Sequence, residues 1–202
     1  QSITMIEGVL RQPFNYQALE VDVAGGVTYK ESTKTVVHPL IHQNELKDYF
    51  DYAFKDYDYF LNLTTLPKRA LIRYLIRASI PFLLLIPLYI FVPWTLLILI
   101  LWLLNLVWAR LRYKDAGYSI KGNQVVFRFR RIARTTSFTK KEHIQALNIN
   151  RNILQRWRNL ATVDIQVLSA PASVTYRVKD LDYEDAVYLY KWFKPDIKVE
   201  KT

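Results

Sequence analysis

A run of basic residues in the second half of the chain has the composition of an anion-binding surface. In the segment 124–131, apolar and basic residues alternate, so that a strand puts Arg128 and Arg130 on one face. The candidate lipid- or partner-binding residues are Arg128, Arg130, Arg131, Arg134, Lys140 and Lys141. A basic sheet face near a bilayer attracts anionic headgroups. The solvated outer face of an antiparallel sheet has the same pattern, and that alternative stays open.

Other residue types that carry chemistry are sparse. His38 and His42 are four residues apart, but Pro39 follows the first of them and no further ligand completes a zinc motif. The chain has no cysteine, no Gly-x-Ser-x-Gly, no phosphate loop and no Gly-x-Gly-x-x-Gly. We therefore expect no catalytic residue, no metal and no cofactor, and we predict that the protein is not an enzyme.

A stripe of arginines precedes a long apolar block. Arg69, Arg73 and Arg77 are spaced by four residues, which places them on one side of a helix. Residues 78–109 contain no Asp, Glu, Lys, Arg or His. Long basic side chains at such a boundary reach the lipid phosphates and set the depth of the helix. The predicted membrane-interface anchors are Lys68, Arg69, Arg73, Arg77, Trp94, Trp108, Arg110 and Arg112.

The apolar block predicts a transmembrane helical hairpin. One helix through it would be about 48 Å long, whereas a hydrocarbon core is about 30 Å thick. Two crossings at 70–90 and 94–113, joined near Pro93, fit better and put both basic flanks on one side. The positive-inside tendency then makes both soluble segments cytoplasmic in a multi-pass protein. Trp102 and Asn105 favour helix packing or a buried hydrogen bond over a transport path.

The net charge of +10 alone could indicate a nucleic-acid partner. Seven of the basic residues flank the apolar block, so membrane placement explains much of the excess. The expected partners are therefore the lipid bilayer and a protein or a second copy of the chain, and no nucleic acid is expected.

The two parts on either side of the apolar block resemble each other. A shift of 144 positions sets Asn15 on Asn159 and the alternating segment 19–23 on 163–167. A shift of 140 aligns two amphipathic helices, one near 46–53 and one near 186–193. We expect residues 1–54 to be the C-terminal part of a first, truncated copy of the domain, so that the strands of its first half lie upstream of the chain as given.

The remaining boundaries follow from this repeat. Residues 55–69 form a linker, 70–113 the hairpin and 114–198 a complete second copy. The second copy predicts strands at 118–120, 124–131, 134–139, 145–151, 161–168 and 174–179, followed by a helix at 182–194 that Asp180 or Asp182 caps. Strands in a run that one helix closes are typical of an α+β antiparallel sheet or partly open barrel.

Two aromatic segments allow more than one interpretation. Trp157 lies between Arg156 and Arg158 in a predicted turn, where burial under the barrel is favoured over an exposed interaction anchor. Tyr57, Tyr59 and Phe60 in the linker favour a simple connection, with an amphipathic segment on the membrane surface as the alternative.

Several short motifs that follow the predicted membrane hairpin carry a family resemblance. They are Ala116-Gly117-Tyr118, Lys141-x-x-Ile144-Gln145, Leu154-Gln155-Arg156, Leu160-Ala161-Thr162-Val163 and Glu184-Asp185-Ala186. With these motifs the chain resembles the bacterial pleckstrin-homology-like (PH-like) domains of the YdbT/YdbS membrane-protein family. It looks like the C-terminal part of a YdbT-type member. The resemblance implies a seven-stranded PH-like β-barrel with a C-terminal helix, which the hairpin attaches to the bacterial cell membrane on its cytoplasmic side. A departure is the turn Arg130-Arg131-Ile132-Ala133, where the family often has a glycine.

The resemblance supplies no reaction. It implies a membrane scaffold or interaction protein whose cytosolic PH-like domains bind a protein partner or the anionic membrane surface, with a broad link to cell-envelope integrity. The alternative is a subunit of an export or antimicrobial-peptide resistance system, in which the hairpin packs against membrane helices of a partner.

Overall fold

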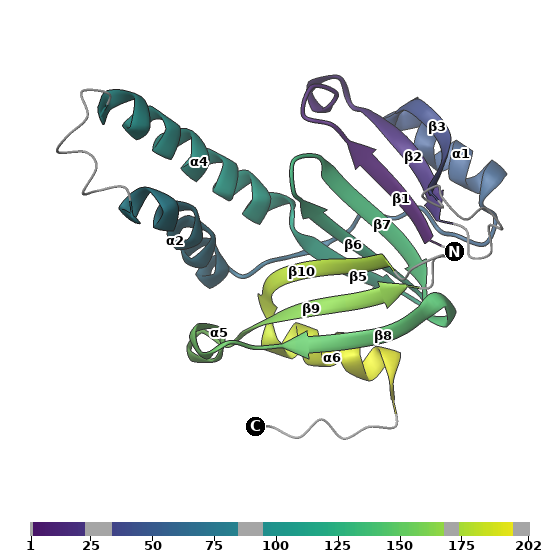
Figure 1. The fold of residues 1–202 in the computed structure, drawn as a ribbon. Coiled ribbons are helices and arrows are strands. Elements are labelled where there is room, and N and C mark those ends of the chain that lie inside the picture. The colour runs from purple at the N-terminus through teal and green to yellow at the C-terminus, as the bar shows by residue number, and fades with distance from the viewer. Residues whose placement is uncertain (1, 23–33, 85–94, 168–173, 196–202) are drawn as a thin grey trace, which may run out of the picture.

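The computed structural model describes residues 2–22, 34–84, 95–167 and 174–195 (Figure 1). In chain order its main elements are β1 (Ser2–Glu7), β2 (Tyr16–Asp22), β3 (Lys34–His42), α1 (Leu46–Ala53), β4 (Thr64–Thr65), α2 (Lys68–Leu84), α4 (Thr95–Asp115), β5 (Gly117–Lys121), β6 (Gln124–Arg130), β7 (Arg134–Lys140), β8 (Ile144–Asn150), α5 (Ile153–Trp157), β9 (Leu160–Val167), β10 (Val174–Asp182) and α6 (Tyr183–Phe193).

Strands β5 to β10 and helix α6 form a PH-like antiparallel β-sheet domain with a C-terminal helix. All six strands predicted for this domain are present, and β10 continues three residues beyond the predicted end. Strands β5–β7 belong to one sheet and β8–β10 form another, and helix α6 packs on the shared core through Ala186 and Leu189. Asp182 caps α6 by accepting a hydrogen bond from the Glu184 amide, as one of the two alternatives predicted.

The seventh strand implied by the resemblance is not among the described residues after position 114. A short strand, β4, which precedes the helical hairpin in the chain, pairs with β5 instead, and Thr64 lies opposite Tyr118. A Cβ atom on Gly117 would lie 2.7 Å from the Thr64 carbonyl oxygen. Glycine is therefore required at the point where the chain leaves the hairpin and re-enters the sheet.

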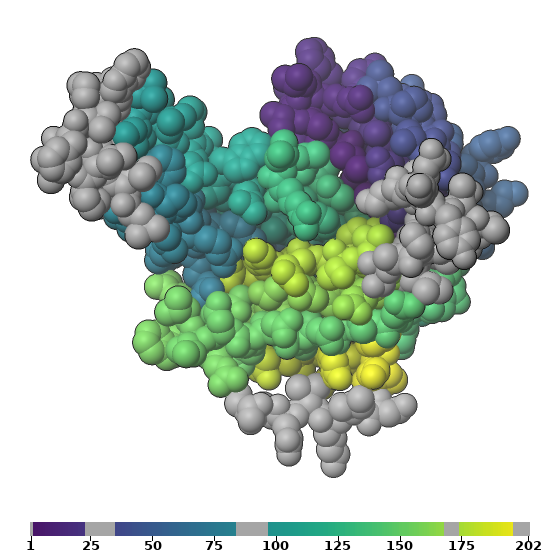
Figure 2. Space-filling model, viewed as in Figure 1, coloured from purple at the N-terminus to yellow at the C-terminus, as the bar shows by residue number. Residues whose placement is uncertain are grey.

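Helices α2 and α4 lie antiparallel and project from the domain (Figures 1 and 2). The Trp102 indole donates to Ser79 Oγ at 3.1 Å and Asn105 Nδ2 donates to the Ala78 carbonyl oxygen at 2.8 Å, so both side chains serve helix packing as predicted. The predicted junction at 91–93 and Trp94 lie outside the described residues. Among the helices described, none is both long enough and apolar enough to cross a membrane. The membrane-spanning hairpin is not confirmed.

Strand β1 extends the sheet of the PH-like domain, which has the order β3-β2-β1-β7-β6-β5-β4. One face of β6 and β7 contributes Val125 and Phe127 to the first core, whereas Val126 and Phe138 lie in a second core with Phe50 of α1. The sheet is therefore covered on both sides. The linker closes the second core, because Tyr57 is buried and Tyr59 stacks on Phe138.

The units 2–53 and 144–193 have the same strand pairing. Met5 opposes Leu19 in the first unit, and Ile149 opposes Val163 in the second, at a shift of 144. Asn15 and Asn159 both have positive φ, 56° and 51°, and both carbonyl oxygens accept a backbone hydrogen bond, from Gln43 and Tyr183. That residues 1–54 are the end of a preceding copy of the domain stays a prediction.

Candidate functional site: a cationic pocket at the base of the hairpin

Helix α2 is docked on the domain by the arginine stripe. Arg73 Nε lies 2.9 Å from Asp180 Oδ1 and Arg77 Nη2 lies 3.0 Å from Asp180 Oδ2, while Arg69 pairs with Asp182. Asp180 is fully buried and has a φ of 59°, at a bulge where the β9–β10 register shifts. Asp tolerates this left-handed conformation better than most residues. The stripe thus contacts carboxylates of the domain, which sequence spacing did not reveal.

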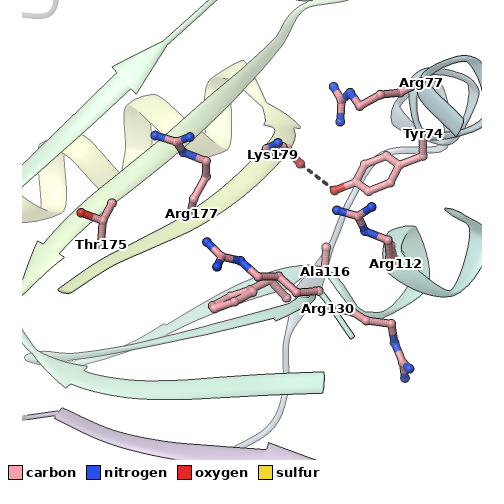
Figure 3. Close-up of a pocket in the computed structure, with 10 residues that line it drawn as sticks. Tyr74, Arg77, Arg112, Ala116, Arg130, Thr175, Arg177 and Lys179 are labelled. Atoms are coloured by element: carbon pink, nitrogen blue, oxygen red, sulfur yellow. Dashed lines mark hydrogen bonds between the residues drawn. The ribbon is translucent and has the colours of Figure 1, made fainter. Parts of the chain in front are cut away.

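A cavity of about 130 Å³ lies beside this contact, between the hairpin and the strands, and we call it the basal pocket. Figure 3 shows the residues of its wall. They are Tyr74 and Arg77 of α2, Arg112 of α4, Ala116 between α4 and β5, Phe129 and Arg130 of β6 with Arg131 after it, and Thr175, Arg177 and Lys179 of β10. Six of the ten are cationic and none is acidic. The Tyr74 hydroxyl donates to the Lys179 carbonyl oxygen at 3.2 Å and thereby joins α2 to β10.

Half of these cations have a carboxylate partner behind the wall. Arg77 pairs with Asp180, Arg130 with Asp115, and Arg177 with Asp164 at 2.5 and 2.9 Å. Within the described part of the chain, Arg112, Arg131 and Lys179 make no ion pair. Partial burial lowers the pKa of Lys179, and the charges of Arg77, Arg112 and Arg177 lower it further. The pocket therefore has an uncompensated positive potential.

This arrangement suits a small anion with several acceptor oxygens. Guanidinium groups present planar pairs of donors that match phosphate, and lysine adds a compact point charge. The apolar side of the cavity consists of Phe129 and Ala116. A more open depression of about 450 Å³ continues from it along Arg77, Arg177 and Lys179 toward Asn150 and Asn152, and Asp164 also lines it. In the described residues no cluster of three or more potential metal ligands occurs, and His38 and His42 instead contact Tyr49 and Tyr16.

The six basic residues predicted as a lipid- or partner-binding set are divided by the structure. Arg130 is buried and pairs with Asp115, and Arg134 pairs with Glu7 of β1 and lies 3.6 Å from Asp115. These two arginines join β1 and the end of α4 to the sheet. Arg128 donates to Thr136 Oγ1 at 3.0 Å, and burial lowers its pKa. Arg131 is exposed and lines the basal pocket.

The two lysines of the set lie at the other end of β7. Lys140 is above the Tyr57 ring and 3.7 Å from Glu142, and Lys141 is above the Trp192 ring. The face that carries Arg128 and Arg130 is covered by α1 and the linker, because it also contains Val126 and Phe138, which pack with Phe50 and Tyr57. A continuous exposed basic sheet face is therefore not present.

The predicted interface anchors also have different environments. Lys68 and Arg110 are exposed. Arg112 lines the basal pocket, and the Arg130 guanidinium lies 5.4 Å from the Trp108 ring centroid. Trp157 is 81% exposed, so the favoured burial of this residue is wrong and the alternative of an exposed side chain is correct.

Sequence reasoning missed Tyr74, Arg177 and Lys179 as pocket residues. A signal was present, because Thr175, Arg177 and Lys179 alternate with Tyr176 and Val178 along one strand. The pattern places them on the polar face of β10, but it does not reveal that the hairpin stands over that face.

Comparisons with known proteins agree with this architecture. Residues 74–196 match the family model described as bacterial PH domain. The chain is 32% identical over 197 residues to a protein of Bacillus subtilis (strain 168) named "UPF0699 transmembrane protein YdbT". That alignment covers 96% of this chain and 40% of the relative, so the chain spans less than half of the relative's length. No solved structure matches.

Proposed function

The chain belongs to the bacterial PH domain family, in its YdbT-type group, and on that premise we propose that it is a membrane-associated scaffold whose basal pocket holds the phosphate of an anionic lipid headgroup. The observation that carries this proposal is the set of three cations around one cavity, Arg112, Arg131 and Lys179, that have no carboxylate partner among the described residues. A lipid surface supplies the anion at high local concentration, and each basic residue near it contributes about 1 kcal/mol.

The position of the pocket relative to the apolar block supports a lipid source. Arg77 and Arg112 line the pocket and flank the uncharged stretch 78–109 at its two ends. Large apolar side chains are exposed on both helices, among them Ile76, Ile80, Leu103 and Leu104. Exposed apolar surface of this extent requires a cover, and the name of the Bacillus subtilis relative describes that protein as transmembrane. In this proposal the hairpin crosses the bilayer, the pocket lies at the headgroups, and the domain is cytoplasmic.

The proposal extends to the first unit. We propose that residues 1–54 are the C-terminal part of a preceding PH-like domain, which the shared register of the two units supports. Two such domains joined by a membrane hairpin would present two rigid surfaces at one leaflet, which is the geometry of a scaffold.

The test compares lipids of different charge on the protein purified in a neutral detergent. Thermal unfolding is followed while mixed micelles of phosphatidylglycerol or phosphatidylcholine are added. A bound ligand raises the midpoint, so phosphatidylglycerol should stabilise the protein and phosphatidylcholine should not. Inorganic phosphate and glycerol phosphate form a second arm, and stabilisation by these to the same extent would indicate a soluble phosphate ligand.

The variant that tests the pocket combines Arg112→Gln, Arg131→Gln and Lys179→Gln. The matched control combines Lys47→Gln, Lys55→Gln and Lys191→Gln, which remove the same charge at exposed positions that do not line the basal pocket. The proposal requires that the pocket variant lose the response to phosphatidylglycerol and that the control keep most of it. Equal losses would mean that net charge and not the pocket is responsible.

A further inference from the structure

Two exposed turns repeat each other in sequence and in position. The first tip, between β1 and β2, exposes Val9, Leu10 and Phe14, and the second tip, in and around α5, exposes Ile153, Leu154 and Trp157. At the shift of 144, Val9 corresponds to Ile153 and Leu10 to Leu154. Leu10 is 87% exposed and Trp157 81% exposed. None of the described residues covers these large apolar side chains in the two equivalent turns, and exposed apolar groups of this kind mark an interaction surface.

Each tip is held in place by a glutamine that reaches the base of the hairpin. Gln155 is buried, donates to Asp180 Oδ1 at 2.9 Å, and forms a capping box with Asn152. Asp180 is the carboxylate that binds Arg73 and Arg77 of α2. The second tip is thus fixed beside α2.

The first tip is fixed beside α4 in the same manner. Gln12 donates to the Glu7 carbonyl oxygen at 2.9 Å and accepts a hydrogen bond from Arg130 Nη2 at 2.7 Å. Arg130 pairs with Asp115, the last residue of α4. Figure 1 shows the β1–β2 connection and α5 on the two sides of the hairpin.

The charges of the tips identify the surface that they fit. Residues 8–15 and 151–159 contain no Asp or Glu, and Arg11, Arg156 and Arg158 stand next to the apolar side chains. Apolar and aromatic residues flanked by arginine are typical of segments that lie at a membrane interface, where the ring enters the headgroup region and the cations contact phosphates.

We propose that the two tips insert into the membrane interface on either side of the hairpin, and thereby fix the tilt of the PH-like domain against the bilayer. This inference rests on the proposed membrane crossing of the hairpin, but not on anion binding in the basal pocket. A protein partner that covers the tips is the competing occupant, and the test separates the two.

The absence of cysteine from the chain allows a test with single labelled cysteines. Leu10→Cys and Leu154→Cys carry an environment-sensitive fluorophore in the full chain, reconstituted in bilayers that contain nitroxide-bearing lipids. Tyr52→Cys in α1, 83% exposed, is the control for an exposed site away from the hairpin. Ile100→Cys in α4 reports on the hairpin itself.

The expected result is strong quenching at Leu10→Cys, Leu154→Cys and Ile100→Cys and little at Tyr52→Cys, in zwitterionic as well as anionic bilayers. If the two tip probes match Tyr52→Cys while Ile100→Cys is quenched, insertion of the tips is overturned and the membrane crossing stands. Quenching at one tip alone overturns the paired contact. An unquenched Ile100→Cys overturns the membrane crossing, and the inference with it.

Discussion

The units 2–53 and 144–193 have corresponding strand pairings, but the residue at the bulge of the third strand has a different role in each. In the second unit this residue is Asp180, buried and bound to two arginines of α2. In the first unit the corresponding residue, at a shift of 140, is Leu40, which is exposed. The second unit thus differs from the first in one buried carboxylate, that of Asp180, which holds helix α2 against the domain. The arginines of α2 are needed there, because a buried carboxylate without a partner would be unstable.

The largest loss of stability is expected when the carboxylate of Asp180 is removed. Asp180→Asn keeps a residue that tolerates positive φ, but it leaves the buried Arg73 without its carboxylate. Breaking a buried pair from one side costs about 3–5 kcal/mol. The free energy of unfolding, measured with denaturant in detergent, should fall by an amount in this range.

Asp182→Asn is the matched control for that change. Its partner Arg69 is 41% exposed, and Asn caps a helix as well as Asp does. A loss below about 1 kcal/mol is expected. If both variants lose the same stability, the docking carboxylate has no special role and the comparison between the units fails.

A smaller effect is expected where the first unit joins the sheet. Glu7→Gln removes the charge that Arg134 contacts across the β1–β7 ladder. Because Arg134 keeps Asp115 at 3.6 Å, its charge is not left alone, and the loss should be about 2 kcal/mol. This loss is measured by denaturing the Glu7→Gln variant and comparing it with Glu20→Gln, a variant at a less buried strand position. An unchanged midpoint for Glu7→Gln would show that β1 is held by its backbone hydrogen bonds alone.

The two units should respond equally at their positive-φ asparagines. Asn15→Ala and Asn159→Ala each remove the short polar side chain that allows asparagine to adopt the left-handed region, at a cost of up to about 1–2 kcal/mol, whereas glycine at either position should be close to neutral. Denaturation of the four variants tests this. A cost at one position only would indicate that the two turns are equivalent in shape but not in strain.

The smallest effect is expected for the unpaired cation of the basal pocket. Lys179→Gln should change the free energy of unfolding by less than about 0.5 kcal/mol at pH 7. Because folding lowers the pKa of Lys179, the folded state binds this proton less tightly than the unfolded chain does. The stability of the wild type should therefore gain a small increment as the pH rises through the lowered pKa toward 10.5, relative to Lys179→Gln. An increment of the opposite sign would contradict a positive pocket.

The order of the elements was predictable from local patterns. Alternation along 124–130 and 161–167 and the helical spacing at 186–193 each reflect one buried face, which is a property of neighbouring residues. Asn15 and Asn159 correspond in the sequence repeat and both have positive φ, because the conformation of a turn also depends on neighbouring residues. The strands of the second unit therefore agreed with prediction to within a few residues.

The environment of the basic residues was not predictable in the same way. Arg128 and Arg130 alternate like the residues of a solvated face, yet α1 and the linker cover that face because Phe138 and Val126 lie on it too. Arg131 was predicted as one of six binding residues and is the member of that set that remains both exposed and at the basal pocket. Exposure depends on what packs opposite, and that information is distant in the chain.

The sequence by itself determined the α+β plan, the apolar block with its basic flanks, the correspondence between the two units and the lack of catalytic motifs, because each follows from composition or from periodicity over a few residues. The tertiary structure decided which charges are neutralised. Arg77 and Asp180 are 103 positions apart, and Arg134 and Glu7 are 127 apart. Only the folded arrangement brings them together and leaves Arg112, Arg131 and Lys179 without an ion pair to any described residue, since Coulomb attraction acts over distances in space and not along the chain.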